Sequence, residues 1–279
     1  MIDIRSMTRI DLPFGENLSL QAGWNQTAAD WLRFLELQSS GCFVAEISGK
    51  PVGTVTTCVF DHVGWIGMML VHPSARRQGV GRALMTRAIQ YLEGQATDVI
   101  RLDATPIGEP LYTSLGFKTQ YRITRFAGSA CSPSDEKNVE HCQQPDWEKI
   151  AAFDEPLTGY SRRKLFRRFG KEPAIRAIVA ENNGEMFGYV FSRPGRHTAH
   201  VGPCMARNTE VGVKLIGQAL SQYCGQPVNV DVPDDNRHAV ETISSLGLEP
   251  ARGLVRMCRG KEALESLESL WASGGPEKG

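Results

Sequence analysis

The apolar and polar positions of the first 127 residues follow two alternating periods. In the segment 79–93 the apolar residues Val80, Leu84, Ala88 and Leu92 recur at helical spacing, which predicts a helix with one buried face. The same reasoning predicts helices at 11–22, 27–38, 79–93 and 108–115, and strands at 3–8, 42–47, 51–60, 64–71, 98–104 and 117–126. Strands that alternate with helices after an opening meander predict an α/β (α+β) fold, with a mixed, mostly antiparallel twisted sheet flanked by helices.

The second half of the chain repeats this pattern. Three pairs of segments match: 44–55 with 179–190, 80–88 with 211–219, and 114–117 with 245–248. The first pair has the signature of a β-hairpin with a polar glycine turn, and the other two pairs share an offset of 131 residues. A constant offset predicts a duplicated domain. We expect a first domain at 1–127, a linker at 128–144, a second domain at 145–260 and a C-terminal tail at 261–279.

The linker and the tail are predicted from composition. Residues 128–144 bring Ser, Pro, Asp, Glu and Lys together without apolar periodicity, as linkers do. The tail carries a short helical pattern followed by Gly274-Gly275-Pro276, which predicts a helix that frays at its end.

Charge and cysteine content narrow the classes of partner. The chain has 31 Lys and Arg against 31 Asp and Glu, so no global field attracts a polyanion and we expect no nucleic acid. The one basic run, at 162–168, has amphipathic helical spacing and is interpreted as a solvated face. Seven scattered cysteines without a C-x-x-C pair predict neither a disulfide framework nor a metal site. Since no apolar run reaches signal or membrane length, we expect a soluble, cytoplasmic protein without a membrane partner.

The strongest candidate for chemistry is the loop that follows the strand at 64–71. It reads Arg76-Arg77-Gln78-Gly79-Val80-Gly81-Arg82 and opens the helix at 79–93. Helix N-termini present free N–H groups and partial positive charge, and glycine keeps side chains away from them, so the loop is a candidate phosphate site. It is neither a dinucleotide fingerprint nor a P-loop. The alternative is a glycine-softened turn with its arginines in solvent.

The same loop resembles the Arg/Gln-x-x-Gly-x-Gly/Ala motif of the GNAT superfamily of N-acetyltransferases, with Arg76, Gly79 and Gly81 at the motif positions. The resemblance covers about residues 1–127, and the second copy looks like a degenerate GNAT-like domain. It implies acetyl-coenzyme A as co-substrate, its pyrophosphate held by the loop and its pantetheine arm paired with the preceding strand. The residues implied are Met69, Leu70, Val71, Arg76, Arg77, Gln78, Gly79, Val80, Gly81 and Arg82. A bulge in that strand is common in the family and opens a slot for the thioester.

The second copy serves as an internal control. At the offset of 131, Glu210 takes the position of Gly79, and Ile243 that of Tyr112. A carboxylate near a pyrophosphate is repelled, and isoleucine donates no proton, so we expect one coenzyme per chain.

The transfer chemistry also follows from the resemblance. Leu111-Tyr112 before Gly116-Phe117 is similar to a family segment whose tyrosine lies near the coenzyme sulfur, which makes Tyr112 the candidate general acid. The alternative is that Tyr112 is a core residue. A backbone N–H near Leu70 or Val71 is expected to meet the oxyanion. The candidate bases are Asp61, His62 and His72.

The acceptor is expected near Trp24, Asn25 and Asp30, between the first two helices. An aromatic ring with polar neighbours suits a small amine, although Asn25 also reads as a cap and Trp24 as core. The function expected is direct transfer of an acetyl group to a small-molecule amine in a ternary complex, with the second domain shaping the acceptor site. The alternative is a non-catalytic sensor of coenzyme A or a metabolite, or a dimerisation module. The duplicated fold is compatible with a homodimer.

Overall fold

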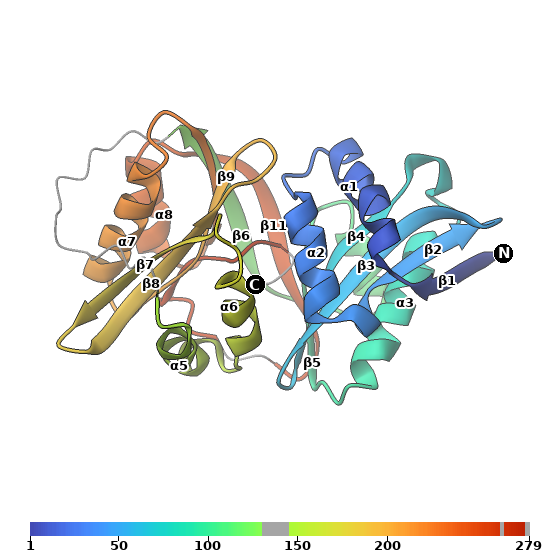
Figure 1. Cartoon of the computed structure of the whole chain (residues 1–279), viewed down its shortest axis with the longest axis horizontal. Coiled ribbons are helices and arrows are strands. Elements are labelled where there is room, and N and C mark those ends of the chain that lie inside the picture. The colour runs from blue at the N-terminus through green and yellow to red at the C-terminus, as the bar shows by residue number, and fades with distance from the viewer. Residues whose placement is uncertain (130–144, 263–264, 277–279) are drawn as a thin grey trace.

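A twelve-stranded sheet runs through both halves of the chain in the computed structural model, which describes residues 1–129, 145–262 and 265–276. Eleven strands follow the order β1-β2-β3-β4-β5-β11-β6-β10-β9-β8-β7, and β12 pairs with β9. Figure 1 shows the first half at the right in blue and cyan, the second half at the left, and β6 and β11 between them. Among the described helices, none is long and apolar enough to cross a membrane.

The first half contains every element that its sequence pattern predicts. Its strands are β1 (Ile2–Ser6), β2 (Phe43–Ile47), β3 (Lys50–Phe60), β4 (Val63–Val71), β5 (Val99–Ala104) and β6 (Lys118–Ser129). Its helices are α1 (Leu12–Gln21), α2 (Ala28–Leu37), α3 (Val80–Glu93) and α4 (Glu109–Ser114), with 3-10 turns at Arg9–Asp11, Ser39–Gly41 and Pro73–Ala75.

The second half repeats this order with two helices ahead of its strands. Its helices are α5 (Trp147–Thr158), α6 (Arg163–Phe169), α7 (Thr209–Ser221) and α8 (Arg237–Ser245). Its strands are β7 (Arg176–Asn182), β8 (Glu185–Arg193), β9 (Ala199–Ala206), β10 (Pro227–Pro233), β11 (Glu249–Gly260) and β12 (Leu270–Ala272). The two predicted hairpins are β2–β3 and β7–β8, both antiparallel.

Helices cover both faces of the sheet. α3 packs on one face of the first half, where Leu84 and Ala88 are fully buried, as their spacing predicts. α1 and α2 pack on the opposite face around Trp31. α6 contacts α2 at the junction of the two halves (Figure 1), and its Phe166 shares a core with Trp65 of β4. The two halves therefore pack together through helices as well as through the sheet.

The last strands of the two halves are exchanged. β5 pairs with β11 from the second half, and β6 from the first half pairs with β10, all antiparallel. β11 and β6 also pair with each other in the middle of the sheet. The sheet is therefore continuous across the two halves, and β6 runs past residue 127 to Ser129. The exchange places residues of the second half directly beside β5.

A buried polar network lies at this exchange. Arg256 of β11 donates to both carboxylate oxygens of Asp103 of β5, at 2.7 and 2.8 Å. It also donates to the hydroxyl of Tyr121, which in turn donates to Glu265 at 2.6 Å. Arg101 forms an ion pair with the carboxylate of Glu265 at 3.0 Å. Since buried charges are costly unless paired, the network favours the register in which these partners meet.

Two local expectations are wrong. The tail forms no helix within residues 265–276, the part of it that the structure describes after the gap: Leu270–Ala272 forms β12, and Trp271 is buried against α7. Within the basic run, Arg162 is not solvated, because it is buried and donates to both oxygens of Asp154 at 2.9 and 2.7 Å. Of the predicted linker, residues 128 and 129 end β6, and 130–144 lie outside the described residues.

The buried network makes the free energy of unfolding depend on pH, through the carboxylate of Glu265. Burial alone would raise the pKa of Glu265, but Arg101 and Arg256 outweigh it and hold the pKa at about 2, below the ordinary value near ~4.3. A depressed native pKa contributes stability that is present above pH ~4.3 and is lost as the pH falls towards 2. We expect Glu265→Gln to lower the free energy of unfolding by roughly 3 kcal/mol at pH 7, with a gap to wild type that narrows progressively below pH 5.

Urea unfolding between pH 3 and pH 7 measures that gap. Glu93→Gln is the control, because Glu93 pairs with Arg259 in half-exposed surroundings and should change stability by no more than ~0.5 kcal/mol. A gap for Glu265→Gln that stays constant across this pH range would contradict the assignment.

Candidate active site

β4 and β5 separate halfway along their length. They pair in parallel only where Val63, Gly64 and Trp65 face residues 99–101 of β5. Beyond Trp65, β4 carries a bulge, because Leu70 pairs with Thr54 and Gly67 pairs with Thr56, which leaves one extra residue on β4. Bulges bend a strand away from its neighbour, and a slot opens between the two strands.

The bulge lies at Met68 and Met69, at the start of the segment Met69-Leu70-Val71 that is expected to bind the pantetheine arm. Met68 has a φ of 49°, in the left-handed region, and its carbonyl accepts a hydrogen bond from the Thr54 hydroxyl at 2.9 Å. This hydrogen bond from β3 stabilises the distorted backbone of β4 at Met68. The predicted bulge is therefore present and supported by its neighbour.

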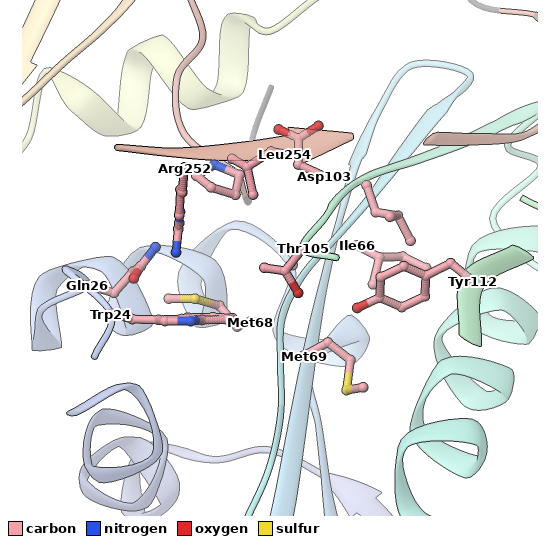
Figure 2. A pocket seen from close by; sticks show the side chains of 13 residues that line it. Trp24, Gln26, Ile66, Met68, Met69, Asp103, Thr105, Tyr112, Arg252 and Leu254 are labelled. Carbon is pink, nitrogen blue, oxygen red and sulfur yellow. The ribbon is translucent and has the colours of Figure 1, made fainter. Parts of the chain in front are cut away.

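The slot continues through the sheet as a cleft with an empty volume of about 570 Å³, including its open mouth. Figure 2 shows Trp24 and Met68 on one side and Tyr112 on the other, with Thr105 between them. Tyr112 belongs to the core under α3, whereas Trp24 and Met68 belong to the core under α1 and α2. Groups from both faces of the sheet thus meet in one cleft.

The second half of the chain contributes part of this cleft. Arg252 and Leu254 of β11 line it, as does Pro276 from the C-terminal segment. They reach it because β11 lies beside β5 after the strand exchange. Sequence reasoning missed these residues, since no local pattern pairs β5 with a strand about 150 residues further along the chain.

Tyr112 points its hydroxyl into the cleft from α4 (Figure 2). Gly108 permits this position, because a Cβ there would lie 2.8 Å from the tyrosine ring. The ring packs edge-on against Phe117, and burial raises the pKa of Tyr112 to about 12. Its hydroxyl makes no hydrogen bond to any described residue. The phenol is therefore protonated at neutral pH and available to a ligand.

The predicted phosphate loop leaves its backbone N–H groups open. Gly79 is the N-cap of α3 and has a φ of +85°, a conformation that favours glycine. Within the described chain, no group accepts a hydrogen bond from the N–H groups of residues 78–82. The loop side chains fold back instead: Gln78 donates to the Ser74 carbonyl and Arg82 to the Ser114 hydroxyl. An exposed helix N-terminus of this kind fits a pyrophosphate.

The loop arginines lie beside this terminus on the surface. Arg76 and Arg77 are exposed, and Arg76 donates to the Val71 carbonyl at 3.2 Å. Val80 is buried beneath the loop, and Gly81 faces Met69, whose terminal carbon would lie 3.2 Å from an added Cβ. The loop and the slot are thus adjacent along β4 and α3.

Of the predicted acceptor residues, Trp24 lines the cleft, whereas Asn25 and Asp30 line an adjoining polar pocket. Asn25 joins the two halves, since its side chain donates to the Thr198 carbonyl and accepts from two backbone N–H groups of the second half. Asp30 completes a capping box at the start of α2 and pairs with Arg33. The polar atoms of Asn25 and Asp30 already make structural interactions, so Trp24 is the better placed of the three.

The candidate bases do not line the cleft. Asp61 and His62 lie in the turn before β4, at the opposite end of that strand from the bulge. Asp61 accepts a hydrogen bond from the Ser161 N–H at 2.6 Å, and His72 is bonded to Ser74. Among the described lining residues, none is a histidine.

In the second half the corresponding slot is closed by the chain itself. β9 and β10 pair in parallel only at 199–201 of β9, and β12 then pairs with β9. Trp271 of β12 fills the space over Gly212 of α7. Only Arg207 and Asn208 connect β9 to α7, and the Asn208 side chain caps the helix by accepting from the Val211 N–H. Among the described residues, β12 leaves no slot there, and Asn208 caps the first turn of α7 through the Val211 N–H.

The aligned acidic residue does not block this second site by itself. Glu210 lies in the first turn of α7, is largely exposed and pairs with Lys214 at 2.8 Å. Ile243, the counterpart of Tyr112, is fully buried in α8. The expected loss of a coenzyme site in the second copy therefore rests on the short connection and on β12 rather than on charge repulsion alone.

Comparison with known proteins agrees with this geometry. Residues 6–117 match the acetyltransferase (GNAT) family, and residues 150–272 match an acetyltransferase (GNAT) domain. The chain belongs to the GNAT superfamily. It is a GNAT-type acyltransferase with a second GNAT-like region, and the family implies an acyl-coenzyme A donor. The first match ends just before β6, the exchanged strand.

Relatives match most of the chain in sequence or in fold. Holothin acyltransferase from Pseudoalteromonas sp. (strain SANK 73390) is 26% identical over 259 residues, which cover 92% of this chain and 87% of the relative. The crystal structure of a protein described as an acetyltransferase from Pyrococcus horikoshii has a TM-score of 0.87 at 22% identity, covering 100% of this chain and 96% of that one. A tandem GNAT protein from the clavulanic acid biosynthesis pathway has a TM-score of 0.63 at 16% identity, covering 95% and 100%. The two structures show that the tandem fold is shared.

Because Trp271 fills the slot of the second half, substitution of glycine by alanine in α7 should have opposite effects on stability at Gly212 and at Gly217. A Cβ on Gly212 would lie 1.9 Å from the Trp271 ring, whereas one on Gly217 would meet nothing within 4 Å. We expect Gly212→Ala to destabilise the protein by about 2–4 kcal/mol through displacement of β12. Gly217→Ala should stabilise it by up to ~1 kcal/mol through helix propensity. Urea unfolding of both variants measures the difference, and equal effects would count against Trp271 as a tightly packed plug.

Proposed function

We propose that this GNAT protein transfers an acetyl group from acetyl-coenzyme A to the amine of a small molecule, by direct attack in a ternary complex. The observation that carries the proposal is the cleft through the sheet, which joins Tyr112 on the α3 face to Trp24 on the α1–α2 face. Two substrates that enter from opposite faces meet in it without a covalent enzyme intermediate. Holding them together supplies much of the acceleration.

The donor would lie on the α3 face. The open N–H groups of residues 78–82 would hold the pyrophosphate, with Arg76, Arg77 and Arg82 around it. The pantetheine arm would follow the free edge of β4 from Val71 to Met69, which β5 leaves unpaired. This order places the thioester at the bulge and next to Tyr112.

The backbone offers one oxyanion donor of the two expected. The His72 N–H donates to the Val52 carbonyl of β3 at 2.8 Å. Because successive N–H groups of a strand point to opposite sides, the Leu70 N–H also faces β3 and the Val71 N–H faces the slot. We therefore assign the oxyanion contact to Val71 rather than to Leu70.

The proton balance gives Tyr112 a relay role. The amine nitrogen forms a bond to the carbonyl carbon, the C–S bond breaks, and sulfur leaves with its electron pair. A phenol with a pKa of about 12 is a weaker acid than a thiol near ~8.5, so it does not by itself protonate a free thiolate. It can give its proton to sulfur while accepting the proton that the acylated nitrogen loses. The incoming ammonium is first deprotonated by water, since the one carboxylate among the described lining residues, Asp103, is bound by Arg256.

The sensor alternative differs from this proposal in one feature. A binding module has no need of a buried hydroxyl that points at the thioester position without a protein partner. Assays of thiol release with acetyl-coenzyme A and a panel of amino acids, polyamines, aminoglycosides and peptides test the proposal directly. Coenzyme binding without thiol release for any amine would favour the sensor.

The relay role predicts a selective loss in Tyr112→Phe. We expect kcat to fall roughly 10²-fold, because the proton path is lost while the packing remains. The Kd for acetyl-coenzyme A should change much less. Tyr91→Phe is the control, since its hydroxyl contacts Gln38 and Ser40 outside the cleft. Steady-state kinetics and calorimetry measure both quantities, and unchanged turnover would remove Tyr112 from the mechanism.

The closed second slot predicts one coenzyme site per chain. Calorimetric titration with acetyl-coenzyme A should give a stoichiometry near one, because β12 fills the second slot and Asn208 caps its helix. Two equivalent sites per chain would show that β12 does not close the second slot.

A further inference from the structure

The bulge of β4 changes which face of the sheet its side chains reach. Ile66 packs in the core under α3, and the strict alternation of a strand would place Met68 on that same face. Met68 instead packs in the core under α1 and α2, because the extra residue of the bulge reverses the alternation. Met69 then packs on the α3 side again. The bulge therefore brings one flexible apolar side chain to the acceptor side of the cleft.

Met68 and Trp24 form an apolar platform on that side. Both line the cleft and belong to the same core, and Figure 2 shows them together on the side opposite Tyr112. The Trp24 backbone is held in place, because its N–H donates to the Ser19 carbonyl at 2.9 Å, directly after Gly23 with a φ of 67°. A methionine sulfur contacts aromatic rings favourably, and its side chain adapts to irregular shapes. A rigid indole beside an adaptable thioether suits a flat apolar ligand.

Among the described residues, no accessible carboxylate lines this cleft. The one acid there, Asp103, has a side chain that is 1% exposed and bound to Arg256 through both oxygens. In the adjoining pocket, the Asp30 side chain is 4% exposed and pairs with Arg33 at 2.6 Å. A second ammonium group on the acceptor would lose water without gaining a counter-ion, which is costly. The lining thus disfavours polyamines and aminoglycosides.

Thr105 supplies a polar group between the platform and Tyr112 (Figure 2). Its hydroxyl accepts one long hydrogen bond, from the Gly108 N–H at 3.4 Å, and no described group accepts a hydrogen bond from it. A hydroxyl has a second lone pair, which can accept an N–H of the acceptor amine. Such a contact would orient the nitrogen towards the thioester position beside Tyr112.

We infer that the acceptor is a primary amine on one flat apolar body without a second ammonium group, with the body on the platform of Trp24 and Met68 and the nitrogen beside Thr105. This inference rests on the proposed function, because it names the class of the second substrate of the same cleft. Burial of the flat body against the platform supplies affinity, and the Thr105 hydroxyl supplies direction.

Three amines test the two parts of this inference. 4-Methylbenzylamine has one amine on a flat ring, 1,4-bis(aminomethyl)benzene adds a second ammonium group to that ring, and methylamine has no ring. With acetyl-coenzyme A, we expect kcat/KM for 4-methylbenzylamine to exceed that for the diamine by about 10-fold or more, because the second charge finds no partner. It should exceed that for methylamine by about 10- to 100-fold, because the ring is buried.

Trp24 variants assign the ring preference to the platform. Trp24→Ala should lower kcat/KM for 4-methylbenzylamine by about 10- to 100-fold and change that for methylamine by no more than about twofold. Trp24→Phe keeps an aromatic face and should retain part of the preference. Phe14→Ala is the matched control and should keep the wild-type ratio, because Phe14 packs in the same core as Trp24 without lining the cleft. The KM for acetyl-coenzyme A and the melting temperature show whether each variant is folded.

A binding measurement keeps the inference separate from turnover. With free coenzyme A no acetyl group can be transferred, and the Kd for 4-methylbenzylamine by calorimetry should rise about 10-fold or more in Trp24→Ala. An unaltered Kd in Trp24→Ala, or a diamine that is acetylated as well as 4-methylbenzylamine, would overturn the inference and leave the proposed function standing. Absence of thiol release with every amine would overturn the proposed function, and an unaltered Kd in Trp24→Ala would overturn the inference even then.

Discussion

The exchange of the last strands is the constraint on which the rest of the structure depends. β11 and β6 lie in the middle of the sheet, each between strands of the other half, so neither half completes its sheet alone. The side chains of Arg256 and Asp103 are buried at this exchange and bonded to each other through two hydrogen bonds. A buried pair adds little net stability, but losing one partner costs several kcal/mol. Shifting β11 by one residue against β5 would separate them, so the pair favours a single register.

That register determines what the active cleft contains. With β11 fixed beside β5, Arg252 and Leu254 come to line a slot whose other walls belong to the first half. Asn25 reinforces the same junction through three hydrogen bonds with the loop at 197–198. The second copy thus forms part of the site without a slot of its own. In the second copy, β12 fills the slot, while β11 supplies a wall of the cleft in the first copy.

Most local structure follows from the sequence, whereas the exchange does not. The helix at 80–93 is predictable because Val80, Leu84 and Ala88 place apolar surface on one side. The hairpins and the glycine loop are predictable because turns and helix starts have residue preferences. No such preference distinguishes β6 from β11 as the neighbour of β5, since both are last strands with similar patterns. Arg252 as a wall of the cleft, and Trp271 as a plug over Gly212, depend on that non-local choice.

The two copies differ in how well their corresponding helix start and strand pair are stabilised by local hydrogen bonds. In the second half, Asn208 caps α7 and Trp271 fills the slot, and both features favour a stable fold. In the first half, α3 begins at Gly79 with no side-chain cap, which forgoes roughly 0.3 kcal/mol relative to Ser or Asn at that position. β4 and β5 also leave peptide groups unpaired beside the cleft. Departures from local consistency concentrate at functional sites. Because the same scaffold avoids both departures in its other copy, the fold does not require them, and a ligand that uses the open N–H groups accounts for their presence.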